Sequence, residues 1–153
     1  MHSPEPETYH VATKAFIRKG DDVLLCLESL GKKWDLPGGR IGVGEFDVPL
    51  EEILKREIVE ELGPNLKYKN NGPAAIFRHR RPEITSENKP EVRVLMIGFE
   101  LEYLGGDIAL SDEHSECRWV PVAEAANLLP GGQQDGIKKY IAYLGSARKT
   151  IVY

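Results

Sequence analysis

The chain has 153 residues, of which 41% are hydrophobic, and this is enough to close one core without disulfide or metal support. Its 20 Lys and Arg stand against 24 Asp and Glu, so the net charge of -4 excludes a general attraction to DNA or to an anionic membrane. We expect one domain over residues 8–153 behind a flexible tail at residues 1–7, with any polyanionic ligand held locally by a metal or by selected cations.

Two cysteines, Cys26 and Cys117, lie far apart in apolar stretches. This pattern favours buried free thiols over a disulfide framework, and free thiols favour a reducing compartment. The first residues are acidic and rich in proline, whereas a signal peptide needs a basic and then an apolar run. No apolar segment reaches the length of a membrane span. The sequence therefore predicts a soluble cytoplasmic protein.

The first half of the chain predicts two strands, a glycine loop and a helix. Residues 8–17 and 22–28 are rich in Val, Phe, Ile and Leu, and the polar turn between them indicates a hairpin. Residues 34–45 contain four glycines, which let backbone approach a ligand closely. We expect a helix at about residues 48–62, with Asp47 as its cap.

The second half predicts more strands and two terminal helices. Residues 74–79, 91–101 and 117–120 have strand composition, and the polar residues 80–90 predict an exposed loop. Helical periodicity follows in two stretches separated by a Pro-Gly-Gly break, residues 122–129 and 134–144. This order predicts an α/β (α+β) fold with a mixed sheet between helices.

Three carboxylates share one face of the predicted central helix. Glu57, Glu60 and Glu61 stand at i, i+3 and i+4, beside a core-facing apolar stripe. Such a cluster repels itself and resists desolvation, and a divalent cation with oxygen ligands removes both problems. Mg²⁺ fits this donor set best, and Mn²⁺ is the alternative.

The competing interpretation is a solvated acidic helix in which Arg56 pairs with Glu52 and Glu60 at spacing four. Helices of that kind are common, and the helix considered alone favours this interpretation. The neighbouring glycine loop favours the metal site instead, because backbone that can approach a ligand closely, beside an acidic face that binds a metal, suits a pyrophosphate.

The segment from residue 38 to residue 64 resembles the signature of the Nudix hydrolase family, which is Gly, five residues, Glu, seven residues, then Arg-Glu-U-x-Glu-Glu-x-Gly-U with U apolar. The matching residues are Gly39, Glu45, Arg56, Glu57, Ile58, Glu60, Glu61 and Gly63. Ten residues rather than seven separate Glu45 from Arg56, and Pro64 replaces the final apolar residue. The insertion puts the usual place of Glu45 in question.

The resemblance implies a Nudix-like α/β/α sandwich and a hydrolase in which divalent cations assist the attack of water on phosphorus. It implies Glu57, Glu60 and Glu61 as metal ligands, with the Gly38 carbonyl as a further candidate. Arg56 would orient the carboxylates. The resemblance also implies substrate contacts from three residues of the motif, namely Gly39, Arg40 and Glu45.

A second acidic segment, residues 111–116, lies just before the last predicted strand. The resemblance implies that an acid from such a loop acts as base or metal ligand, and Glu113 is our first candidate, ahead of Glu116 and His114. An ordinary polar loop is an equally good interpretation. The general base therefore stays open between Glu57 and Glu113.

Two further features of the sequence are weaker candidates for contacts with a substrate. The basic run at residues 78–81 could reach substrate phosphates, but a solvated run is the favoured interpretation. Trp34 and Phe77 could stack on a base, although aromatic residues in strands are more often core.

The activity implied is hydrolysis of a phosphoanhydride bond in a nucleoside diphosphate linked to another moiety. The candidate substrates are nucleoside triphosphates, nucleotide sugars, ADP-ribose and dinucleoside polyphosphates, and the sequence does not choose among these small molecules. The alternative is a catalytically weak module that binds a nucleotide or an RNA 5′ end. The oligomeric state is open, with a homodimer as the commonest form.

Overall fold

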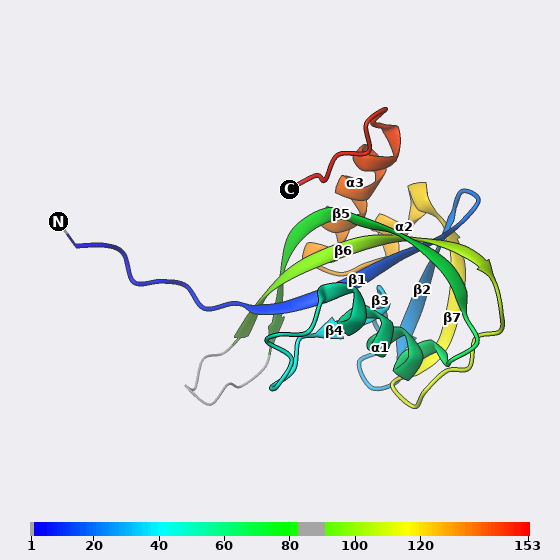
Figure 1. The fold of residues 1–153 in the computed structure, drawn as a ribbon, viewed down its shortest axis with the longest axis horizontal. Coiled ribbons are helices and arrows are strands. Elements are labelled where there is room, and N and C mark those ends of the chain that lie inside the picture. The colour runs from blue at the N-terminus through cyan, green and yellow to red at the C-terminus, as the bar shows by residue number, and fades with distance from the viewer. Residues whose placement is uncertain (1, 83–90) are drawn as a thin grey trace.

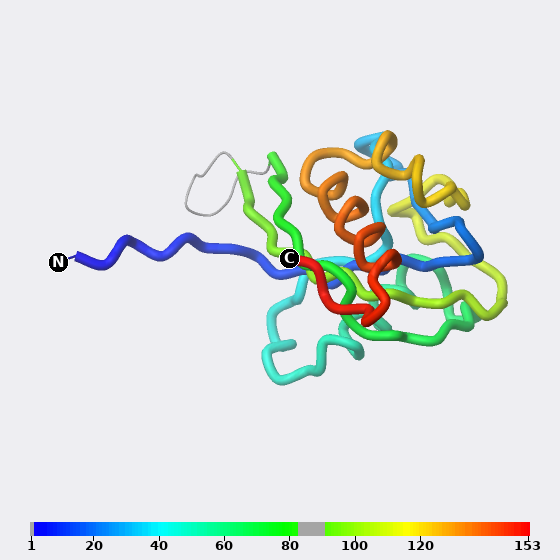
Figure 2. Tube along the Cα trace, turned by 90° about the horizontal axis from the view of Figure 1, so that it is seen from above, coloured from blue at the N-terminus to red at the C-terminus, as the bar shows by residue number. Residues whose placement is uncertain are grey.

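The computed structural model describes residues 2–82 and 91–153. Within that part of the chain the strands and helices are, in order, β1 (His10–Lys19), β2 (Asp22–Glu28), β3 (Trp34–Asp35), β4 (Gly38–Arg40), α1 (Leu50–Leu62), β5 (Lys67–Pro82), β6 (Glu91–Gly105), β7 (His114–Pro121), α2 (Val122–Leu128) and α3 (Gly132–Gly145). Residues 2–9 have no strand or helix and extend away from the rest (Figure 2).

The strands form one mixed sheet with β1 at its centre. β1 runs parallel to β6, and β6 runs antiparallel to β5. β1 and β2 pair only beside their turn, where Lys19 lies opposite Asp22, so the predicted hairpin is confirmed. Beyond this turn β2 pairs with β7 and β3, while β4 takes the place beside β1. The two halves of the sheet thus diverge from a common hairpin.

Helices cover both faces of this sheet (Figure 1). On one face the apolar stripe of α1, formed by Leu54, Ile58 and Leu62, packs against Leu24 and Phe99. On the other face, side chains of α2 and α3 pack against β1, β5 and β6 around a second core. The mixed sheet between helices predicted from the order of elements is confirmed, as is the α/β/α sandwich that the resemblance implies, and α1 lies between the sheet and solvent.

Several predicted boundaries are wrong in informative ways. Helix α1 begins at Leu50 after Pro49, and no side chain among the described residues caps it, so the predicted cap at Asp47 is absent. Pro49 with its fixed φ starts the helix without a capping side chain. β5 continues to Pro82, because pairing with β6 extends into residues predicted to be loop. Residues 83–90 of that loop lie outside the described residues.

The two cysteines form a disulfide, so the prediction of free thiols is wrong. β2 and β7 pair in a register that places Cys26 directly opposite Cys117, with their Cα atoms 4.1 Å apart. A separation of 91 residues in sequence conceals this contact. The cysteines therefore no longer support a reducing compartment. Among the described residues, no helix is long and apolar enough to cross a membrane.

Candidate active site

Helix α1 turns a row of side chains from the core toward an open cavity. Ile53 is buried, Glu57 is half-buried, and Glu61 is only 4% exposed although it carries a carboxylate. The row lies next to the apolar stripe, as the helical spacing predicts. Packing of the stripe against the sheet therefore forces two carboxylates into partial or complete burial.

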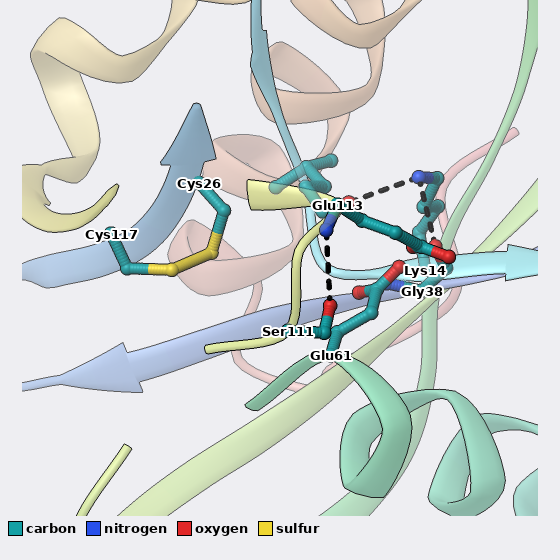
Figure 3. The surroundings of a disulfide bond; sticks show 8 residues. Lys14, Cys26, Gly38, Glu61, Ser111, Glu113 and Cys117 are labelled. Atoms are coloured by element: carbon teal, nitrogen blue, oxygen red, sulfur yellow. Dashed lines mark hydrogen bonds between the residues drawn. A yellow bond between two sulfur atoms is a disulfide. The ribbon is translucent and has the colours of Figure 1, made fainter. Parts of the chain in front are cut away.

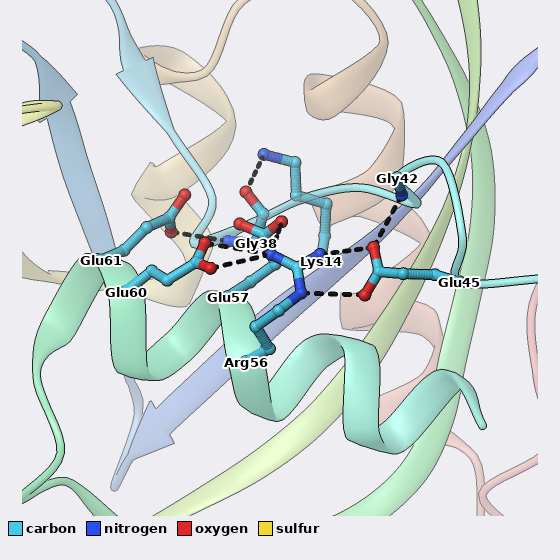
Figure 4. A network of polar contacts seen from close by, with 8 residues as sticks. All are labelled: Lys14, Gly38, Gly42, Glu45, Arg56, Glu57, Glu60 and Glu61. Carbon is cyan, nitrogen blue, oxygen red and sulfur yellow. Dashed lines mark hydrogen bonds and ion pairs between the residues drawn. The ribbon is translucent and has the colours of Figure 1, made fainter. Parts of the chain in front are cut away.

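Glu61 is the most deeply buried of these acids. Its Oε2 accepts a hydrogen bond of 2.9 Å from the backbone N–H of Gly38 (Figure 4). Desolvation raises the pKa of Glu61 to about 8, against the opposing effects of the Lys14 ammonium and of the Gly38 N–H. A carboxyl group of this kind binds a proton near neutral pH unless a cation takes the place of that proton.

Glu57 lies against the glycine loop. A Cβ on residue 39 would come within 2.6 Å of Glu57 Oε2, so only glycine fits there without a shift. Gly38 is equally constrained, with φ +125° and no space for a Cβ beside the backbone of Thr13. Burial raises the pKa of Glu57, while the guanidinium of Arg56 opposes that effect. The close approach of backbone to carboxylate, expected from the glycines, is present.

Arg56 connects three carboxylates at the edge of the site (Figure 4). Its Nη2 and Nε donate to both oxygens of Glu45, at 2.8 and 2.9 Å. Its Nη1 lies 3.0 Å from Glu57 and 3.0 Å from Glu60. The pKa of Glu45 is lowered first by the Arg56 hydrogen bond and then by the Gly42 N–H. Despite the insertion, Glu45 thus reaches Arg56.

The described lining of the cavity separates the residues of the motif into two groups. Gly38, Gly39, Arg40, Glu57 and Glu61 line the cavity, whereas Glu45, Arg56 and Glu60 are outside that lining. Glu60 has a side chain that is 57% exposed and engaged by Arg56. Its carboxylate would have to leave the guanidinium to reach a cation inside.

Glu113 and His114 complete a cluster with Glu61. One ligand atom from each of the three residues lies within 4.8 Å of the others. His114 is buried, and its Nδ1 has no hydrogen-bond partner among the described residues. Two carboxylates and an imidazole that come together in this way are a donor set that suits a divalent cation. The residues present therefore fit such an ion.

The chain before β7 is anchored to the end of β2, and Figure 3 shows Glu113 together with the nearby disulfide. The Ser29 N–H donates to the Glu113 carbonyl at 2.9 Å, and the Ser29 hydroxyl donates to the Asp112 carbonyl at 2.7 Å. The Cys26–Cys117 disulfide joins the same two strands a few residues away. Glu113, the first candidate in its segment, is thereby brought to α1, while Glu116 lies further along β7 and outside the cavity lining.

The cavity has a volume of about 560 Å³ and a mixed lining. Glu57, Glu61 and Glu113 contribute carboxylates to it. The lining also includes the apolar residues Ala12, Val94 and Met96 and the cationic residues Arg40 and Arg81. Only Arg81 of the predicted basic run lines the cavity, while His79 accepts a hydrogen bond from Gly132. Phe77 is core, as favoured from the sequence.

Sequence reasoning missed Lys14 and Asp35. Lys14 is 5% exposed and Asp35 is 8% exposed, and they form an ion pair of 3.1 Å at the wall of the cavity. The available signal was a charged residue inside the apolar run of β1. A lysine at that position must bury its ammonium group and needs several acceptors.

The NUDIX domain model matches residues 8–144. The chain belongs to the NUDIX domain family. Among curated relatives, the nucleoside triphosphatase NudI of Salmonella newport is 30% identical over 95 residues, which cover 61% of this chain and 65% of that protein. The chain thus spans less than two thirds of the length of the curated relatives it matches.

Solved structures agree with this assignment. The MutT protein from Methanosarcina mazei Go1 is 26% identical with a TM-score of 0.75, covering 94% of this chain and all of that one. An ADP-ribose pyrophosphatase from Streptococcus suis is 22% identical with a TM-score of 0.66, covering 95% and 98%. At that identity the second likeness shows the fold alone. The Nudix-like fold predicted from the motif is confirmed.

Proposed function

We propose that this chain is a Nudix-type pyrophosphohydrolase that cleaves a phosphoanhydride bond in a nucleoside diphosphate linked to another moiety. The observation that carries the proposal is the convergence of Glu61, Glu113 and His114 in the lining of a cavity of about 560 Å³. That volume lies within the usual range of small-molecule sites. Family membership supports the same class of reaction.

Mg²⁺ or Mn²⁺ is part of the proposal. Glu57, Glu61, Glu113 and His114 would hold the ion, with the Gly38 carbonyl as a further candidate ligand. A divalent cation there would neutralise charge on the bridging oxygens of a diphosphate. Glu60 stays a candidate ligand from the motif, and its carboxylate would have to leave Arg56 to bind the ion.

The other residues have distinct roles in this proposal. Arg56 holds Glu45, Glu57 and Glu60 and acts as a positioning residue. The general base that takes a proton from the attacking water is Glu57 or Glu113, because both line the cavity. Gly39 allows close approach to a phosphate, and Arg40 places a cation at the cavity edge.

Nucleoside triphosphates are the first substrates to test, because NudI carries the name nucleoside triphosphatase. Nucleotide sugars, ADP-ribose and dinucleoside polyphosphates follow. The apolar residues of the cavity lining can accept a base or a ribose, while Arg40 and Arg81 can meet an anionic group. Each compound is incubated with Mg²⁺ or Mn²⁺, and released products are separated by chromatography.

Three variants of α1 test the roles of its acids. We expect Glu61→Gln to lower kcat by about 100-fold or more, because a buried ligand is lost. Glu60→Gln tests whether the exposed acid is also a ligand, and a loss as large as that of Glu61→Gln would support this. Glu51→Gln is the matched control, since Glu51 is exposed in the first turn. Full activity in folded Glu61→Gln would refute the proposal.

A wild-type protein that binds a nucleotide tightly in calorimetry, but releases no product over hours with either ion, would instead be a binding module. A cytoplasmic location and a homodimer are further parts of the proposal. Cell fractionation and light scattering test them directly.

A further inference from the structure

We infer that Lys14 is a positioning residue whose ammonium group is a tethered cation holding the turn from Asp35 to Gly38, and thereby Glu61, in the geometry of the site. The inference rests on the proposed function, because the groups held in place are those of the proposed metal centre. It assigns a role to a residue outside the family signature.

The ammonium of Lys14 is surrounded by oxygen atoms of one short segment (Figure 4 shows Lys14 beside Gly38). Nζ lies 3.1 and 3.3 Å from the two carboxylate oxygens of Asp35, 2.9 Å from the Leu36 carbonyl and 3.3 Å from the Gly38 carbonyl. These acceptors match the three N–H donors of an ammonium group. The side chain is 6% exposed, so water competes little for them.

This segment needs a cation because its acceptors converge from one strand and the following turn. Two carbonyls and a carboxylate that face one buried point would be unsatisfied without a donor, and buried unsatisfied acceptors are costly. Lys14 also pairs with Gly38 through the backbone of β1 and β4. The charge of Lys14 and the register of β1 therefore both hold the backbone at Gly38.

The peptide unit that contacts Glu61 lies between two units whose carbonyls Lys14 binds. The N–H of Gly38 donates to Glu61 Oε2 at 2.9 Å, while its carbonyl accepts from Lys14. Loss of the ammonium would free the Leu36 and Gly38 carbonyls, loosen the backbone on both sides of the Gly38 N–H and weaken its hydrogen bond to Glu61. A defect at Lys14 would thus reach the carboxylate through the backbone of Gly38, in addition to the loss of the ammonium charge near Glu61.

Chemical rescue tests this role. Lys14→Ala removes Cγ, Cδ, Cε and Nζ, which together correspond to n-propylamine. We expect Lys14→Ala to lower kcat for the best nucleotide by about 10–100-fold, the usual cost of losing a group that orients a ligand, with a smaller change in KM. Added n-propylamine should restore about 10-fold of the lost kcat, and this effect should saturate as the n-propylamine concentration rises.

Lys14→Met is the matched control, because its side chain fills the same space and carries no donor. We expect n-propylamine to raise the unfolding temperature and the kcat of Lys14→Ala but of neither wild type nor Lys14→Met. Tetramethylammonium has the charge without N–H donors and should rescue nothing. Rescue of both variants, or rescue by tetramethylammonium, would reduce the effect to ionic strength and overturn the inference.

The unfolding temperature separates this inference from the proposed function. If n-propylamine raises the unfolding temperature of Lys14→Ala while the wild-type protein has no hydrolase activity, the inference stands and the proposed function is refuted. An active wild type whose folded Lys14→Ala variant does not respond to n-propylamine would overturn the inference alone. If Lys14→Ala does not fold, an NMR measurement replaces the rescue. The Lys14 ammonium of ¹⁵N-labelled wild type should give a signal protected from exchange with water, and Lys14→Met should lack this signal. Absence of the signal from wild type would overturn the inference.

Discussion

Binding of Mg²⁺ should release a proton from Glu61 near neutral pH. The buried carboxyl group has a pKa of about 8, so at pH 7 it is about 90% protonated in the metal-free protein. A cation that binds this carboxylate must displace the proton. We therefore expect release of about 0.9 proton per ion at pH 7 and about 0.1 at pH 9, and an apparent affinity that rises about tenfold per pH unit until pH 8.

The same shift makes a prediction for stability. The folded-state pKa of Glu61 is raised above its ordinary value of 4.5, so the stabilising contribution is complete below pH 4.5 and is lost as the pH rises through 8. On account of this group, the free energy of unfolding of metal-free protein falls by about 1.4 kcal/mol per pH unit in that window. Mg²⁺ should reverse the fall.

Titration calorimetry in buffers of different ionisation enthalpy measures the protons released. Glu61→Gln is the reference, because its amide cannot titrate, and the difference between the two proteins isolates Glu61 from Glu57. Equal proton release by wild type and Glu61→Gln at pH 7 would show that burial does not hold this proton. Urea unfolding at pH 5 and pH 8 with a chelator measures the change in stability.

Three further outcomes follow from contacts around the site. Reduction of the Cys26–Cys117 bond should lower the free energy of unfolding by about 2–4 kcal/mol in urea titrations, and a double alanine variant should not respond to reductant. The lysine of Arg56→Lys cannot bind Glu45 through two nitrogens, so the kcat of this variant should fall by about 10–100-fold. The kcat of Glu45→Gln should fall by a similar factor, and clearly unequal effects would show that the two residues do not act through their mutual contact. Burial lowers the pKa of His79, whose neutral ring accepts a hydrogen bond from the first backbone N–H of α3. The contribution of His79 to the free energy of unfolding is therefore complete above pH 6.5 and is lost as the pH falls through the lower folded-state pKa. Urea titrations of His79→Asn should show a smaller loss of stability between pH 7 and pH 5 than those of wild type.

Local patterns in the sequence were enough to predict the layers of the fold and the acidic side chains of the site. The stripe of α1 and the i, i+3, i+4 spacing of Glu57, Glu60 and Glu61 depend only on helix geometry. Even so, spacing alone does not separate Glu60 from Glu61. One is 57% exposed and bound to Arg56, and the other is buried under the sheet, a difference that depends on packing.

Contacts between distant strands were beyond the sequence. The Cys26–Cys117 bond depends on the register of β2 and β7, and one residue of slip would place the two side chains on opposite faces. Lys14 was missed for a similar reason. Its acceptors come from a turn more than twenty residues away, which β4 returns to the side of β1.

The insertion after Glu45 shows why a gapped motif can still form a complete site. Residues 46–49, which follow Glu45, are all exposed, so the added length is accommodated in solvent rather than in the cavity. Both ends of the loop stay fixed, one by β4 against β1 and the other by α1 against the sheet. The guanidinium of Arg56 therefore meets Glu45 as if the extra residues were absent, and the spacing of the motif constrains its ends more than the chain between them.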